Sequence, residues 1–216
     1  MRRQRGFTLI EVLLATVLLA AGLALAFTTL RAASITAQRG EAMAQRNERM
    51  RAVSGFLQAR LAASRPLAFS IDRDNGLPLR FVGDARQLRF VADLPAYLGH
   101  GGPYVHTLHL APAAGGRGRV DLMLSLAVLQ PLDVSDPPEP DPPEPLARDL
   151  ESVAFRYRAL EADGSLGEWR DRWQAPERLP VQVEVAIRDG AGRDWPRLVV
   201  ALPLAGTVTS AFGEGM

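Results

Sequence analysis

Residues 6–30 of this chain form the stretch GFTLIEVLLATVLLAAGLALAFTTL. It is apolar apart from one acid, Glu11, and it follows three arginines, Arg2, Arg3 and Arg5. An ionised carboxylate inside a bilayer costs roughly 2.5 to 3.5 kcal/mol on insertion scales. An ordinary secretory signal keeps its apolar core free of charge, so Glu11 needs a physical reason to be there.

The length of this stretch and the charges beside it predict one membrane span. Residues 7–30 are long enough to cross a hydrocarbon core of roughly 30 Å at about 1.5 Å per residue. Arginines resist translocation, so the short N-terminus is expected on the cytoplasmic side of the bacterial inner membrane. The C-terminal domain is then expected in the periplasm.

The N-terminal residues resemble those of type IV pilins and of the pseudopilins of type II secretion. The features that carry the resemblance are the glycine, the phenylalanine after it and the acid at position 11. The resemblance implies that residues 1–6 are a prepilin leader peptide. It also implies that a prepilin peptidase cuts between Gly6 and Phe7 and methylates Phe7 to N-methylphenylalanine. Glu11 would then neutralise the terminal amine of a neighbouring subunit during assembly.

The second half of the chain is similar to the J-type minor pseudopilins of type II secretion. The segments concerned are LESVAFRY at 150–157, Trp169, Trp173-Gln174, Leu179-Pro180 and VQVEV at 181–185. This resemblance implies a structural subunit of the pseudopilus tip that supports export of folded proteins across the outer membrane. Its partners would be the I-type and K-type minor pseudopilins. No catalytic residue, cofactor or metal is expected.

Three other interpretations stay open from the sequence. A minor pilin of a type IV pilus would share the leader and the topology, although the lack of cysteine counts against it. A cleavable secretory signal would end at the small residues Ala24-Leu25-Ala26, and the mature chain would start at Phe27. A membrane-tethered periplasmic enzyme or solute-binding domain would need a concave polar site, which the sequence does not reveal.

Length and composition set the broad class of the protein. The chain has 216 residues, a formal net charge of +1 and no cysteine. This length supplies one membrane segment and one globular domain with a core. A net charge this close to zero gives no reason to expect electrostatic binding of nucleic acid. The lack of cysteine excludes disulfides, thiol nucleophiles and thiolate metal sites.

Residues 31–64 are predicted to continue the helix as an amphipathic segment that enters the globular domain. The apolar residues recur at helical spacing: Met43, Met50, Val53, Leu57 and Leu61. Such a stripe packs on a sheet, so the methionines are interpreted as core residues. The helix is expected to end near Ser64, before Pro66.

Residues 65–216 are predicted to form a periplasmic antiparallel β domain, which gives an α+β, pilin-like fold in which the long helix packs on the sheet. Strands with one buried face are expected where polar and apolar residues alternate, at 120–126, 153–158 and 181–188. Further strands are expected at 80–82, 88–92, 104–110 and 197–202. Asp163-Gly164 and Asp189-Gly190 predict tight connections.

The pentad DPPEP occurs twice in tandem between Asp136 and Pro145. Proline lacks a backbone donor and fixes φ, so the pattern excludes helix and central strand and predicts an exposed, stiff loop over 131–145. The loop is acidic, but its spacing is not that of a calcium site. We interpret it as a solvated linker, and a contact with a partner remains the alternative.

Three histidines, His100, His106 and His109, lie close together in the sequence. On a strand, positions 106 and 109 face opposite sides of the sheet, so they cannot share a metal ion. We therefore expect isolated polar histidines rather than a metal site.

Overall fold

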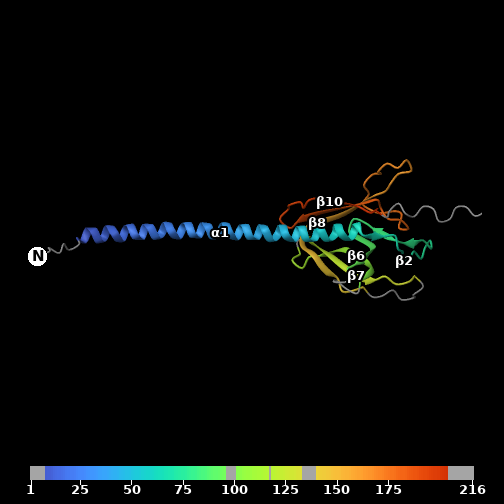
Figure 1. The fold of residues 1–216 in the computed structure, drawn as a ribbon, viewed down its shortest axis with the longest axis horizontal. Coiled ribbons are helices and arrows are strands. Elements are labelled where there is room, and N and C mark those ends of the chain that lie inside the picture. Colours follow the sequence, from blue (N-terminus) through green and yellow to red (C-terminus); the bar gives the residue numbers. More distant parts are fainter. Residues whose placement is uncertain (1–7, 96–100, 117, 133–139, 204–216) are drawn as a thin grey trace, which may run out of the picture. The chain divides into compact units, whose positions relative to one another are not determined.

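The computed structural model describes residues 8–95, 101–116, 118–132 and 140–203 (Figure 1). The chain divides into two compact units, Met1–Arg51 and Ala52–Met216. One helix, α1, extends from Leu9 to Ala62 and contributes to both. It ends at Ala62, close to the expected end near Ser64, and Ser64 itself pairs with Ala92 in a short strand.

The second unit is built on one antiparallel sheet. The strands are β1 Ser64–Arg65, β2 Ser70–Ile71, β3 Pro78–Leu79, β4 Phe81–Gly83, β5 Gln87–Leu94, β6 Gly102–Pro112, β7 Val120–Val128, β8 Glu144–Arg158, β9 Gln182–Asp189 and β10 Leu198–Ala201. The large sheet has the order β1-β5-β6-β7-β8-β9-β10, with β4 also paired to β5. Strands β2 and β3 form a separate hairpin.

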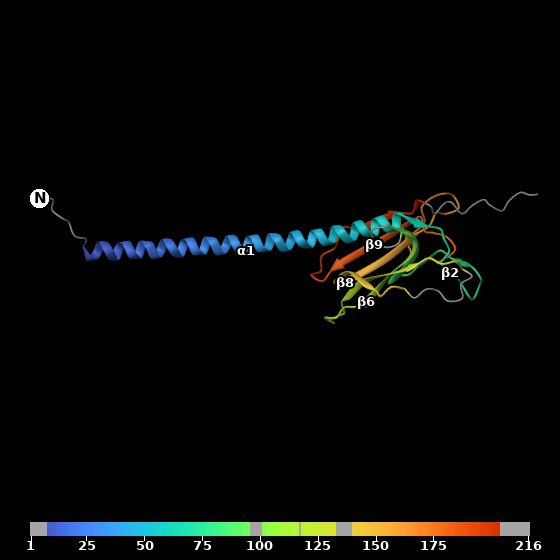
Figure 2. The same ribbon diagram turned by 60° about the horizontal axis from the view of Figure 1, so that its bottom comes forward.

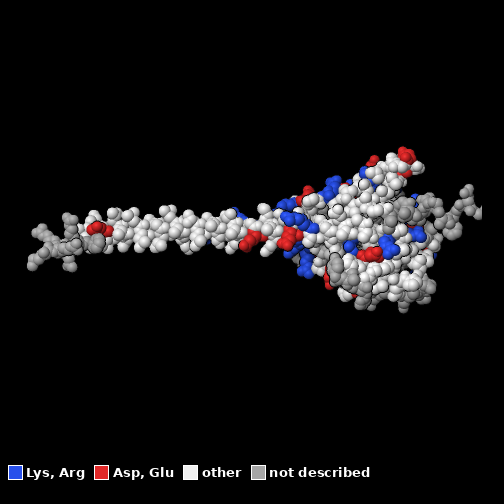
Figure 3. All heavy atoms as spheres, viewed as in Figure 1, with Lys and Arg blue, Asp and Glu red and all other residues white. Residues whose placement is uncertain are grey.

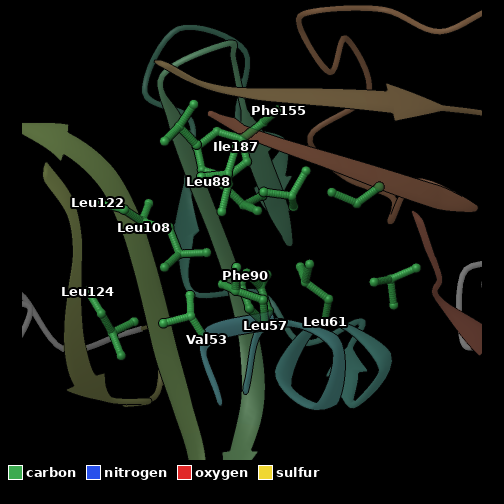
Figure 4. Packing of buried hydrophobic residues seen from close by; sticks show 14 of the residues in the cluster. Val53, Leu57, Leu61, Leu88, Phe90, Leu108, Leu122, Leu124, Phe155 and Ile187 are labelled. Carbon is green, nitrogen blue, oxygen red and sulfur yellow. The ribbon is translucent and has the colours of Figure 1, made fainter. Parts of the chain in front are cut away.

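The last turns of α1 lie against the face of this sheet (Figures 1 and 2). Val53, Leu57 and Leu61 are the buried residues of the helix, and their spacing places them on one side of it. They pack with sheet residues that include Leu88, Phe90, Leu108, Leu122, Leu124, Phe155 and Ile187 (Figure 4). The expected α+β fold, a long helix on an antiparallel sheet, is confirmed.

The two methionines of the predicted stripe are not core residues. Met43 is 56% exposed, and Met50 is only partly buried. Both belong to the first unit, Met1–Arg51, whereas the buried side chains of the helix begin at Val53. The apolar residues of the predicted stripe thus keep one helical spacing although the first two are not buried and the last three are. The spacing alone does not reveal where the contact with the sheet begins.

The sequence pattern located the main strands but underestimated the lengths of four of them, β5, β6, β7 and β8. β7 continues to Val128, and β8 begins at Glu144, inside the loop predicted over 131–145. The end of the second DPPEP pentad is thus a strand, since Pro145 pairs with Met123 of β7. Proline is tolerated there because β9 first pairs with β8 at Leu150, which leaves this part of β8 at an edge.

The change of partner along β8 coincides with irregularities in the pairing of this strand. The pairing of β7 with β8 shifts register beside Leu122, and the pairing of β8 with β9 shifts between Leu150 and Ser152. Next to these shifts Asp149 has φ 57°, and its backbone N–H donates to the Asp121 carboxylate at 2.8 Å. Irregularities of this kind are typical of β-bulges, and on either side of them β8 pairs with β7 up to Leu150 and with β9 from Leu150 onward.

The two Asp-Gly pairs take different roles. Gly164 has φ 80° and its N–H donates to the Glu161 carbonyl at 3.0 Å, so Asp163-Gly164 lies in a tight turn as predicted. In the connection after β9 the residue with positive φ is Gly192 rather than Gly190. The Asp189 carboxylate caps this connection by accepting the N–H of Ala191 at 2.9 Å.

Candidate functional site

The first turn of α1 holds the predicted assembly residue, Glu11. The Thr8 carbonyl accepts the backbone N–H groups of Glu11 and Val12, at 3.1 and 3.2 Å. The Thr8 hydroxyl also accepts the Glu11 N–H, at 3.4 Å. Thr8 is therefore the N-cap of the helix, and Glu11 is an acid in the first turn, where the positive end of the helix dipole favours it.

The spacing of these two residues is a signal that the sequence analysis missed. Thr8-Leu9-Ile10-Glu11 has the T-x-x-E pattern of a capping box. The pattern would give Glu11 a capping role beside the pairing role that we predicted for it, but among the described contacts only the Thr8 half of the box is formed. The two roles differ in one respect, because a glutamine satisfies a capping box but carries no charge.

The remaining polar side chains in the apolar half of the helix are satisfied within the helix itself. Thr16 donates its hydroxyl to the Leu13 carbonyl at 2.9 Å, and Thr28 donates to the Leu25 carbonyl at the same distance. Thr29 makes a similar bond to the Ala26 carbonyl at 2.8 Å. These hydroxyls need no water, so they are compatible with a surrounding of lipid.

The surface of this half of the helix is apolar. This half is Leu9 to Leu30, and Glu11 is its one ionisable side chain. All of its residues are exposed, as are those that follow up to Gln45. In Figure 3 the corresponding surface is almost free of blue and red. The uncharged part, Val12 to Leu30, rises about 28 Å as a helix. By length and composition α1 is able to cross a membrane.

A shallow depression lies beside the acid. Its lining is Glu11, Val12, Ala15, Thr16 and Leu19, and its volume is about 300 Å³. No hydrogen bond reaches the carboxylate oxygens of Glu11 from any residue that the structure describes. The short side chains of Ala15 and Thr16 let another helix approach closely, as small residues do at helix contacts in membranes.

Two of the three predicted site residues, Gly6 and Phe7, lie outside the described residues. The structure therefore places Glu11, and its position four residues after Phe7 follows from the sequence. Of the histidines, His100 also lies outside the described part of the chain.

His106 and His109 lie on opposite faces of β6, as expected. His106 is not an isolated polar residue, however, because it is fully buried on the helix side of the sheet and stacks on Phe90 with ring centroids 5.2 Å apart. His109 is partly buried and lines a groove on the other face. Within the described ranges no cluster of three or more His, Asp or Glu side chains is placed to hold a metal ion.

Comparisons with known proteins show what the chain is similar to. Residues 1–27 match the family described as the prokaryotic N-terminal methylation motif. Over 205 residues the chain is 49% identical to type II secretion system protein J of Xanthomonas campestris pv. campestris, covering 94% of this chain and 95% of that relative. A chain in the crystal structure of the GspK-GspI-GspJ complex from the type 2 secretion system of enterotoxigenic Escherichia coli is 13% identical. That match has a TM-score of 0.46 and covers 72% of this chain and 96% of that one.

Proposed function

This chain belongs to the family of type II secretion system protein J and is a pseudopilin, and we propose that its N-terminus is processed between Gly6 and Phe7. The prepilin peptidase would remove residues 1–6 and methylate Phe7. The methylation motif that matches residues 1–27 supports this proposal. The interpretation as a secretory signal ending near Ala26 is disfavoured, because α1 continues through that position without a break.

The single observation that carries the assembly mechanism is the isolation of Glu11. It is the one ionisable group in the apolar half of α1, while the hydroxyls there are bonded to the helix backbone. A carboxylate in hydrocarbon is tolerated chiefly when it is paired. We propose that the partner is the terminal ammonium of a neighbouring subunit, and that the depression beside Glu11 receives the helix of that subunit.

The apolar helix anchors the protein in the inner membrane, and its orientation is part of the proposal. Arg2, Arg3 and Arg5 precede the span, and arginines favour the cytoplasmic side. The short N-terminus would thus be cytoplasmic and the sheet unit periplasmic. There the chain would join the I-type and K-type minor pseudopilins at the tip of the pseudopilus.

Two substitutions separate pairing from helix capping. Glu11→Leu removes both the charge and the capping side chain, whereas Glu11→Gln removes the charge alone. If pairing is the role of Glu11, both variants insert normally but co-purify poorly with the I-type and K-type subunits, and protein export falls. Normal recovery of both variants in the tip complex and normal export would refute the pairing role.

The N-terminus itself is tested by mass spectrometry of the native protein. A chain that begins with N-methylphenylalanine at position 7 is the expected result. An intact leader, or a chain that begins at Phe27, contradicts the proposed processing. Deletion of the gene is expected to abolish exoprotein release and to leave twitching motility intact, which separates this function from that of a type IV pilus.

A further inference from the structure

A groove of about 590 Å³ lies on the face of the sheet opposite α1. One wall is β2 with its neighbours Phe69 and Arg73, and the other is the segment that follows β7. The floor crosses three paired strands, because Arg89 of β5 is in register with Thr107 of β6, and Thr107 with Ser125 of β7. The floor therefore presents a guanidinium beside two hydroxyls.

Arg89 is the central group of this floor. Its guanidinium lies over the ring of Phe69, 4.9 Å from the centroid, and its Nε has no hydrogen-bond partner among the described residues. Burial lowers the pKa of Arg89, and among the residues that the structure describes no carboxylate opposes that effect. A partly buried cation without a counter-charge is unfavourable in the free protein and is relieved when an anion binds.

The lining of the groove is positive. Arg73 and Arg89 carry this charge, and no Asp or Glu occurs among the described residues that line the groove. Arginine binds carboxylates with paired hydrogen bonds, and the hydroxyls of Thr107 and Ser125 supply further donors next to it. The ligand that fits this charge carries carboxylates.

The rim of the groove is apolar. Ile71, Val128 and Leu132 line it and are 47%, 49% and 44% exposed. A small organic acid would satisfy Arg89 but would leave these side chains in water. A polypeptide segment with alternating acidic and apolar residues uses both features, because an extended chain presents side chains of both kinds along its length.

We propose that this groove binds an acidic, partly apolar segment of a partner polypeptide, with a carboxylate of that segment paired to Arg89. The proposal concerns the sheet unit and rests neither on leader cleavage nor on Glu11. It therefore holds or fails independently of the assembly mechanism given above.

The proposal is tested on the full-length protein in detergent micelles with a phage-displayed library of random linear peptides. The enriched peptides are synthesised, and their binding is measured by fluorescence anisotropy. Arg89→Met keeps the side-chain stem on Phe69 and removes the charge, and Ala127→Trp fills the groove without changing its charge. Arg172→Gln, an exposed arginine outside the groove lining, is the matched control.

We expect acidic peptides with apolar neighbours to be enriched. Their affinity falls about tenfold or more in Arg89→Met, which is the loss expected for a charged hydrogen bond. It also falls in Ala127→Trp and is unchanged in Arg172→Gln. The proposal is wrong if the library yields no enrichment over Arg89→Met, if the enriched peptides lack acids, or if succinate alone binds as tightly as they do.

The chain's own acids Asp133, Asp136 and Glu139 lie outside the described residues. A variant in which all three are neutralised is included, in order to test whether they compete with the peptides for the groove. If only this variant binds the peptides, the groove serves the chain's own acidic segment and the proposal fails. Circular dichroism of each variant confirms folding. If Arg89→Met does not fold, Ala127→Trp still decides the outcome, since it leaves Arg89 in place.

Discussion

The hydroxyl of Thr8 accepts the backbone N–H of Glu11 at the start of α1. This bond closes the first turn of the helix immediately after the proposed cleavage site. It therefore links the proposed new end of the chain to the acid that is proposed to pair. The helix start is set by Thr8, and Glu11 is placed by that start.

The cap predicts a local effect of Thr8→Val, which keeps the branched shape and removes the acceptor. The first turn of α1 should lose roughly 1 kcal/mol of stability, which is the usual cost of an N-cap. Hydrogen exchange in bicelles should then be faster at the amides of Glu11 and Val12. Thr16→Val is the control, because its hydroxyl bonds only to the Leu13 carbonyl inside the helix. Equal exchange in both variants would contradict the capping role.

A second prediction concerns the contact between α1 and the sheet. Leu57 is 1% exposed, so Leu57→Ala should destabilise the sheet unit by about 2 to 5 kcal/mol. Met43→Ala, on the same helix but exposed, should change the free energy of unfolding little. Urea unfolding followed by tryptophan fluorescence measures both. A similar loss for the two variants would mean that the helix packs differently from the arrangement in Figure 4.

The sequence predicts most of the elements because their residues alternate or repeat with a clear period. The alternation of Val120, Leu122 and Leu124 predicts β7. The helical spacing of Val53, Leu57 and Leu61 predicts the side of α1 that packs on the sheet. What it does not predict depends on partners far away in the chain. The strand at Glu144–Pro145 exists because β7 pairs with it, and local proline content cannot reveal that. The proposed groove likewise needs three strands in register before Arg89 meets Thr107 and Ser125.

A third prediction compares two glycines. A Cβ on Gly83 would meet the ring of Tyr157, whose hydroxyl is held by the Asp84 carbonyl at 2.8 Å. Gly83→Ala should therefore cost about 1 to 3 kcal/mol of stability, as overpacking usually does. Gly55 lies in α1 with nothing within 4 Å of an added Cβ, so Gly55→Ala should stabilise by roughly 0.5 to 1 kcal/mol. Thermal unfolding distinguishes the two signs, and a stabilised Gly83→Ala would contradict the described packing.

His106 makes the stability of the sheet unit depend on pH. Its Nδ1 lies 3.1 Å from the Tyr104 carbonyl oxygen, which only accepts, so Nδ1 carries the proton of the neutral ring. The other ring nitrogen, Nε2, is buried and has no partner among the described residues. Burial lowers the pKa of His106 to about 4, the Tyr104 carbonyl opposes that shift, and the positive charge of Arg60 adds to it. The folded protein thus holds this histidine neutral at pH values where the unfolded chain protonates it.

The sign of the effect follows from this difference in pKa. Between about pH 6.5 and pH 4 the unfolded state binds more protons, so stability falls as the pH is lowered through that range, by at most about 3 kcal/mol. His106→Phe keeps a ring stacked on Phe90 but cannot titrate, so its urea midpoint should change less between pH 7 and pH 5 than that of the unmodified protein. His109→Gln, on the opposite face of β6, should retain the full dependence. If His106→Phe lost stability on acidification as steeply as the unmodified chain does, another group would have to carry the effect.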